Sequence, residues 1–292
     1  MATISEWVEG ARPRTLPAAV APIVAGSGIA WFEGGLAPGI AALCLLVALA
    51  LQVGVNYAND YSDGIRGTDA DRVGPMRLVG SGAAAPSLVR NAAFAAFGVA
   101  AVAGLIIVVL TSMWWLLAVG ASAIAAAWFY TGGSRPYGYL GLGELFVFIF
   151  FGLVAVGGTT LVQLGRLTAA TGWASVAIGA LACAILVANN LRDLIGDRAV
   201  GKHTLATRLG DRGTRLFYVA LVAIAGIAVV GVAATSSWWA LLGLLMLVLL
   251  VRAGGEVLAG AAGRSLIPVL RVTGLAELVC SLGLGLGLVL GR

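Results

Sequence analysis

Acidic and amide side chains gather in two short stretches of this 292-residue chain. The first stretch reads NYANDYSDG and begins at Asn56, and the second reads NNLRDLIGD and begins at Asn189. Residues three or four apart lie on the same face of a helix, so each stretch would present one amide and two carboxylates as a stripe. The two expected stripes are Asn56, Asp60 and Asp63, and Asn189, Asp193 and Asp197.

Carboxylates so close to one another repel unless cations neutralise them. Magnesium suits hard oxygen ligands and usually binds one or two carboxylates together with a phosphate. One stripe alone could be an ordinary solvated helix end, but two equivalent stripes predict a site that holds Mg²⁺ and a diphosphate between them. A diphosphate needs further positive charge, and basic residues lie in or beside the two stretches: Arg72, Arg77, Arg192, Arg198 and Lys202.

The composition indicates an all-α membrane protein. Hydrophobic residues make up 60% of the chain and charged residues only 11%, whereas soluble domains carry roughly 25% charged residues. The 42 glycines and the continuous apolar runs favour helices that pack through small residues over a β-barrel. The three cysteines lie in separate apolar runs and the chain has one histidine, which argues against a zinc site or a disulfide framework.

Apolar windows of roughly 20 residues, the length that crosses a bilayer, predict nine transmembrane helices. The two acidic stretches lie four predicted helices apart, which fits two four-helix halves followed by a ninth helix. The predicted spans are approximately 14–33, 36–58, 88–111, 113–131, 141–163, 171–191, 214–235, 237–253 and 268–290.

The basic residues predict the orientation. With a cytoplasmic N-terminus and an external C-terminus, all of the 18 Lys and Arg residues except Arg166 and Arg292 fall on inner segments, as the positive-inside rule requires. Both acidic stretches then lie at the cytoplasmic face.

Five sequence blocks, in this order, resemble the UbiA-type superfamily of intramembrane prenyltransferases. The resemblance covers almost the whole chain and implies a single domain, 1–292, with nine helices around a central cavity in a bacterial cell membrane. The blocks are ARPRTLP at 11–17, NYANDYSDGIRGTD at 56–69, YTGGSRPYGYLGLGE at 130–144, NNLRDLIGD at 189–197 and KHTLATRLG at 202–210.

The resemblance also implies roles for individual residues. It assigns the catalytic carboxylates as two magnesium-binding pairs, Asp60 with Asp63 and Asp193 with Asp197. It implies that two amides, Asn56 and Asn189, orient the metal-bound diphosphate. It also implies that five basic residues contact the diphosphate oxygens: Arg72, Arg77, Arg192, Lys202 and Arg135.

The aromatic substrate has its own candidates. Arg14, with Arg12 as the second choice, would bind its carboxylate, and Tyr130 and Tyr137 lie where the family caps the cavity. The chain departs from the family at Gly67, where many members carry a third aspartate, and its next carboxylate is Asp69.

The five blocks are most similar to members that act on 1,4-dihydroxy-2-naphthoate in menaquinone biosynthesis. They imply Mg²⁺-dependent transfer of a polyprenyl group from polyprenyl diphosphate with loss of CO₂, giving demethylmenaquinol. The expected partners are these two substrates and membrane lipid, without nucleic acid. Two alternatives stay open, a UbiA-type enzyme with another aromatic acceptor and a secondary transporter. The sequence leaves undecided the prenyl chain length, the homo-oligomeric state, the residue that orients the acceptor, and the roles of Asp69, Glu144 and Glu277.

Overall fold

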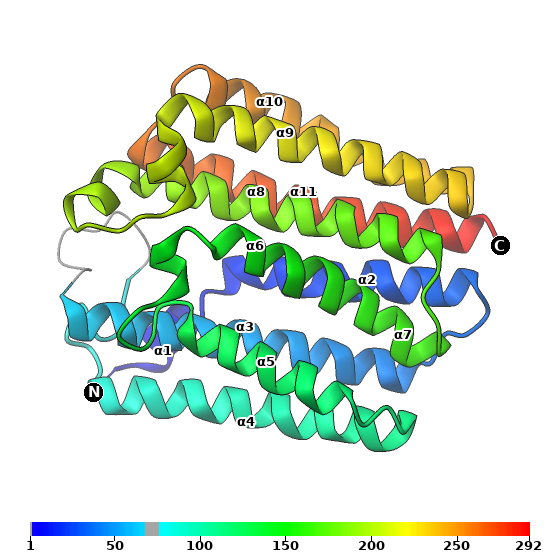
Figure 1. The fold of residues 1–292 in the computed structure, drawn as a ribbon, viewed down its shortest axis with the longest axis horizontal. Coiled ribbons are helices and arrows are strands. Elements are labelled where there is room, and N and C mark those ends of the chain that lie inside the picture. The colour runs from blue at the N-terminus through cyan, green and yellow to red at the C-terminus, as the bar shows by residue number, and fades with distance from the viewer. Residues whose placement is uncertain (1, 68–75) are drawn as a thin grey trace.

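The computed structural model describes residues 2–67 and 76–292, and its regular structure there is entirely helical. The helices lie side by side with their long axes close to parallel (Figure 1). A π-helical segment, Phe148–Gly157, joins α6 to α7. The α-helices are α1 (Ile4–Gly10), α2 (Leu16–Phe32), α3 (Pro38–Arg66), α4 (Pro86–Thr111), α5 (Leu116–Phe129), α6 (Gly143–Val147), α7 (Gly158–Leu164), α8 (Ala169–Ala199), α9 (Leu205–Thr235), α10 (Met246–Leu258) and α11 (Leu266–Leu290).

Eight helical stretches in the described residues are long and apolar enough to cross a membrane. The prediction of an all-α membrane protein is confirmed, but the count of nine spans is not. The predicted span 113–131 contains only α5, a helix of 14 residues, which is about 21 Å long against a hydrocarbon core of about 30 Å. The arrangement in two halves stays a prediction.

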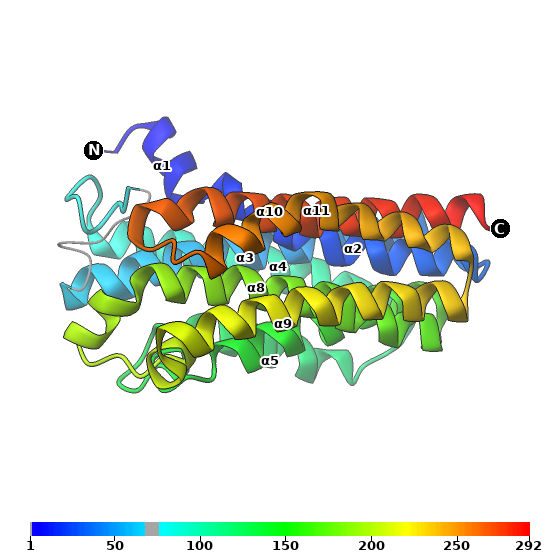
Figure 2. The same cartoon turned by 90° about the horizontal axis from the view of Figure 1, so that it is seen from above.

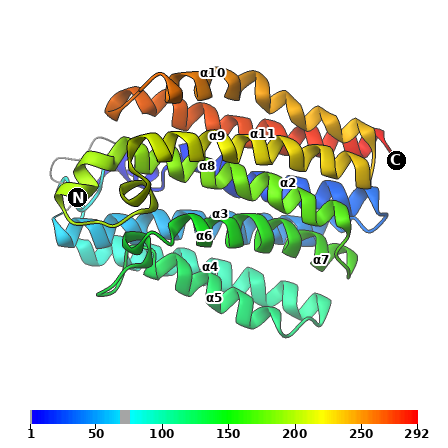
Figure 3. The same ribbon diagram turned by 45° about the horizontal axis from the view of Figure 1, so that its top comes forward.

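Helix α8 forms the centre of the bundle. It packs against α9, α11 and the π-helical segment, and Figures 2 and 3 show its neighbours on several sides. Small residues allow this packing: a Cβ atom at Gly152 would lie 2.6 Å from the Ser175 carbonyl oxygen. Close backbone approach of this kind is how helices associate in lipid, where burial of apolar surface gives little advantage.

The C-terminal ends of α3 and α8 lie at the same end of the bundle as the N-terminus, and the C-terminus lies at the other end (Figure 1). Gly67 caps α3 in the left-handed conformation, with φ of 70°. A residue without Cβ is favoured there, so the backbone conformation itself favours glycine at this position. The fold therefore brings the two acidic stretches to one end of the molecule, while the orientation of that end in the membrane stays a prediction.

Candidate active site

Asp60 lies on the buried face of α3 and is only 1% exposed. Its Oδ2 accepts a hydrogen bond from the backbone N–H of Leu78 (2.7 Å), and its Oδ1 accepts one from the N–H of Val79 (3.0 Å). Both carboxylate oxygens therefore hold the loop that carries Arg77. The predicted role of Asp60 as a metal ligand would compete with these two backbone donors.

Asn56, one turn earlier on α3, binds the N-terminal segment. Its Nδ2 donates to the carbonyl of Ala11 (2.9 Å) and to Oγ1 of Thr15 (3.0 Å). Nε2 of Gln52 donates to the same hydroxyl at 3.0 Å. In this structure the amide of Asn56 thus positions the segment that contains Arg14.

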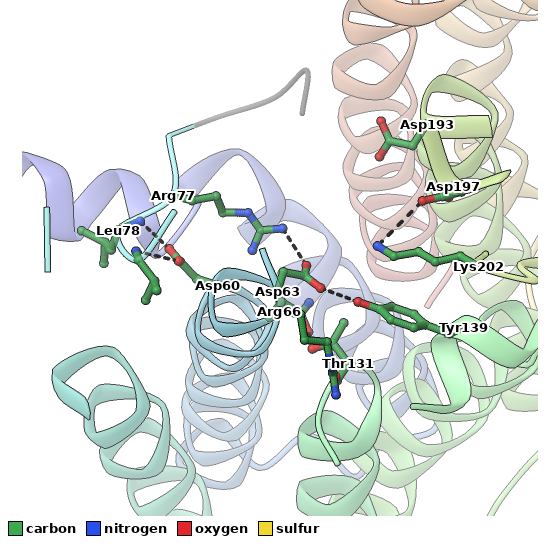
Figure 4. A network of polar contacts seen from close by, with 12 residues as sticks. Asp60, Asp63, Arg66, Arg77, Leu78, Thr131, Tyr139, Asp193, Asp197 and Lys202 are labelled. Carbon is green, nitrogen blue, oxygen red and sulfur yellow. Dashed lines mark hydrogen bonds and ion pairs between the residues drawn. The ribbon is translucent and has the colours of Figure 1, made fainter. Parts of the chain in front are cut away.

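Asp63 completes the stripe on α3 and faces the second acidic stretch (Figure 4). Its Oδ2 pairs with a guanidinium nitrogen of Arg77 at 3.2 Å, and both side chains are more than nine-tenths buried. Its Oδ1 accepts the hydroxyl of Tyr139 at 2.6 Å. Burial and the nearby Asp63 carboxylate raise the pKa of Tyr139, so this phenol stays protonated and can donate.

The second stretch lies on α8, which continues as one helix through Asp193 and Asp197. Arg192 binds Asp193 with two hydrogen bonds, of 2.7 and 2.6 Å. Lys202, in the loop after α8, pairs with Asp197 at 3.8 Å. Asn189 is partly buried and forms no side-chain hydrogen bond with the residues that the structure describes.

Tyr139 connects the two acidic stretches. Its hydroxyl binds Asp63, and the Nζ of Lys202, which pairs with Asp197, lies 4.4 Å from the centre of its ring. Figure 4 shows this row of side chains between α3 and α8. Sequence reasoning missed Tyr139, although it lies in the block that supplied Tyr130 and Tyr137. The available signal was a third tyrosine in the block 130–144.

The carboxylates at this site suit a magnesium ion that also binds a phosphate. In the described part of the chain they are too few and too far apart to coordinate the ion through protein ligands alone. No group of three or more Asp, Glu, His or Cys side chains converges within residues 2–67 and 76–292. Magnesium commonly takes one or two carboxylates and completes its coordination with water and phosphate. The pairs on α3 and α8 offer that number of ligands, beside cations that could bind the remaining phosphate oxygens.

The other predicted site residues differ in whether the structure gives them contacts. Arg14 and Arg135 are exposed, and neither forms an ion pair or side-chain hydrogen bond within the described part of the chain. Tyr137 donates its hydroxyl to the Ala126 carbonyl (2.9 Å), and its ring lies against Tyr130. Arg72 and Asp69 lie outside the described residues.

Arg66, which sequence reasoning also missed, ties the end of α3 to the segment before Tyr139. Its guanidinium donates to the carbonyls of Thr131 and Gly133, and the Thr131 hydroxyl donates to Asn59 at 2.7 Å. These contacts hold the Tyr139 segment over the acidic end of α3.

Sequence comparison with known proteins identifies the family of this chain. Residues 19–258 match the UbiA prenyltransferase family. The chain is 53% identical to a protein of Mycobacterium tuberculosis named 1,4-dihydroxy-2-naphthoate octaprenyltransferase, over 100% of this chain and 99% of that one. It is 36% identical to the Escherichia coli protein of the same name, over 98% and 96% of the two chains.

Solved structures share the fold at low sequence identity. A UbiA homologue from Aeropyrum pernix superposes with a TM-score of 0.71 at 16% identity, over 99% of both chains. A UbiA homologue from Archaeoglobus fulgidus, bound to GPP and Mg²⁺, gives 0.65 at 15% identity, over 96% of this chain and 99% of that one. From the sequence match and the full-length relatives, the chain belongs to the UbiA prenyltransferase family.

Proposed function

We propose that this protein transfers a polyprenyl group from polyprenyl diphosphate to 1,4-dihydroxy-2-naphthoate with loss of CO₂. The products would be demethylmenaquinol, diphosphate and CO₂, in menaquinone biosynthesis. The observation that carries the proposal is 53% identity, over the full length of both chains, to a protein named for octaprenyl transfer to this acceptor. The charges that such a transfer needs would come from the charged centre between α3 and α8, which comprises Asp63, Arg77, Tyr139, Arg192, Asp193, Asp197 and Lys202.

Magnesium is part of the proposal because of the ligands available to it. Asp63, Asp193 and Asp197 would hold the ion together with the diphosphate, and Asp60 would contribute only by releasing a backbone donor. Mg²⁺ bound there would neutralise negative charge on the diphosphate. The family supports this assignment, since the Archaeoglobus fulgidus homologue was solved with GPP and Mg²⁺.

The basic side chains of the site would stabilise the leaving group. Arg77, Arg192 and Lys202 each already bind a carboxylate of the acidic stretches, so their charges converge on the region where the diphosphate would lie. Donors held in place before the reaction stabilise the charge that develops on the leaving oxygen without further reorganisation. Arg72 and Arg135 are proposed as additional contacts.

The surroundings of the charged centre suit the other substrate groups. The apolar bundle would keep the prenyl chain and its allylic cation away from water, which prevents hydrolysis. Arg14 is proposed to bind the carboxylate of the acceptor, with Tyr130 and Tyr137 against its rings. We place the N-terminus and the active site on the cytoplasmic face of a bacterial cell membrane, following the distribution of Arg and Lys.

An assay with purified protein tests the proposed function. Mg²⁺, a series of polyprenyl diphosphates and 1,4-dihydroxy-2-naphthoate should give prenylated product together with stoichiometric diphosphate, and EDTA should stop the reaction. Turnover of 4-hydroxybenzoate without turnover of the naphthoate would contradict the proposed acceptor. The absence of diphosphate release with every acceptor would instead favour a transporter.

Tyr139→Phe should raise the KM for the prenyl diphosphate by about tenfold, the usual effect of losing one hydrogen bond to a charged group. The substitution removes the hydroxyl that binds Asp63 and keeps the ring beside Lys202. Tyr218→Phe is the matched control, because it removes a buried hydroxyl that binds Thr273 (2.7 Å) between α9 and α11. Equal KM values in the two variants would show that Tyr139 does not position the site.

A further inference from the structure

Glu144, the second residue of α6, carries a buried carboxyl group outside the two acidic stretches. Glu144 is 6% exposed. Its Oε1 accepts a hydrogen bond from Nδ2 of Asn190 on α8, at 2.9 Å. Its Oε2 is buried and has no hydrogen-bond partner among the residues that the structure describes. Asn190 therefore fixes the orientation of Glu144 and leaves one oxygen to accept a hydrogen bond.

The position of Glu144 relates it to the charged centre. Asn190 lies three residues before Asp193 and seven before Asp197, so the three share one face of α8. A helix rises 1.5 Å per residue, which places Asn190 about 4.5 Å along the axis from Asp193. Glu144 consequently lies about one helical turn deeper in the bundle than the carboxylates of the second stretch.

The immediate surroundings of Glu144 are apolar and aromatic. A Cβ atom on the preceding residue, Gly143, would lie 3.2 Å from a methyl group of Leu186 and 3.5 Å from the ring of Tyr130. The Sγ of Cys183, two turns before Asn190, donates to the backbone carbonyl of Glu144 at 3.1 Å. No basic side chain forms an ion pair with Glu144 within the described parts of the chain.

A buried acceptor without a donor is costly, and native structures rarely tolerate one. The group that satisfies Oε2 must carry an O–H or N–H and must fit an apolar, aromatic environment. The prenyl diphosphate offers no such donor, whereas a hydroxylated aromatic ring offers both the donor and the apolar face. We infer that Glu144, oriented by Asn190, binds a ring hydroxyl of the aromatic acceptor and thereby selects hydroxylated substrates. This inference rests on the proposed function.

A buried water molecule could supply the same O–H donor, so the experiment must separate the two sources. Binding is measured calorimetrically, without prenyl diphosphate, for 1,4-dihydroxy-2-naphthoate, 1-hydroxy-2-naphthoate and 2-naphthoate, which differ only in their hydroxyls. In the wild-type protein the affinity should fall by about tenfold when the hydroxyl that meets Glu144 is absent. In Glu144→Gln the affinity ratio should become smaller, because the amide nitrogen that replaces Oε2 cannot accept the hydroxyl proton and offers only a weaker N–H···O contact.

Glu277→Gln is the matched control. Glu277 on α11 is fully buried, and neither of its carboxyl oxygens has a partner in the described residues. It lies one helical turn after Thr273 and on the same face of α11, and the Thr273 hydroxyl contacts Tyr218 on α9. This variant should keep the wild-type dependence on the ring hydroxyl.

The affinity ratios for the three naphthoates in the variants show whether Glu144 binds the ring hydroxyl. Unchanged affinity ratios in Glu144→Gln, with an altered melting temperature, would mean that Oε2 binds water and would overturn it. Loss of the ratio in Glu277→Gln would overturn the assignment to Glu144. If Glu144→Gln does not fold, Glu144→Asp should show a smaller affinity ratio than wild type, and an unchanged ratio there would overturn the inference. A wild-type protein that binds the prenyl diphosphate but no naphthoate would contradict the proposed acceptor as well.

Discussion

Asp193→Asn should lower kcat/KM by about 10³-fold while the protein keeps its fold. Asp193 would contribute a ligand for Mg²⁺ and orient Arg192, which binds it through two hydrogen bonds. Loss of one strong electrostatic contact to a transition state costs about 10²–10³-fold, and this substitution affects both the metal and the guanidinium. Because the Asp193 side chain is partly exposed, the melting temperature should change little.

Asp211→Asn is the control for that experiment. Asp211 binds Arg215 through two hydrogen bonds of 2.7 Å on α9, so it reproduces the geometry of the Asp193–Arg192 pair outside the acidic stretches. Turnover should stay near the wild-type value in this variant. Near-normal turnover in Asp193→Asn, measured with saturating Mg²⁺ and prenyl diphosphate, would refute the proposed metal site.

Asp60→Asn should lower both turnover and stability. Asp60 is buried and accepts the N–H groups of Leu78 and Val79 with its two oxygens. Asparagine has one acceptor oxygen, and its NH₂ group would face the other N–H. A buried donor without a partner costs about 1–3 kcal/mol, so the loop that carries Arg77 should detach from α3 more often.

Hydrogen exchange distinguishes this effect from loss of a metal ligand. Amide exchange across residues 76–80 should be faster in Asp60→Asn than in wild type, and it should stay at the wild-type rate in Asp193→Asn. Inactive Asp60→Asn protein with unchanged exchange would show that the loop does not depend on Asp60. That result would leave metal binding as the role of this carboxylate.

The two acidic stretches look equivalent in the sequence, and the structure separates them. Their residue types and spacing correctly indicated two helices with carboxylates along one face. In the first stretch, Asn56 and Asp60 use their polar atoms to hold chain segments, and Asp63 alone pairs with a basic side chain. In the second stretch, both Asp193 and Asp197 pair with basic side chains. Spacing predicts which face a residue occupies, and the partner on that face comes from segments that are distant in the chain.

The same reason explains the residues that were missed. Tyr139 binds Asp63 across 76 positions of sequence, and Asn190 binds Glu144 across 46. Neither pair has a local spacing that would reveal it.

The short helix α5 is a different case. The predicted span 113–131 included Trp114 and Trp115 because they are apolar, but these residues form the turn before the helix.

The sequence by itself determined that the protein is a helical membrane protein, that it belongs with the intramembrane prenyltransferases, and that its carboxylates end two particular helices. These properties depend on composition and on spacing within single helices, which one chain segment contains completely. Only the tertiary structure decided that Tyr139 connects the two stretches, that Asp60 anchors the Arg77 loop and that one oxygen of Glu144 has no partner among the described residues. Those properties depend on which distant segments the packing of α3, α6 and α8 brings within hydrogen-bonding distance.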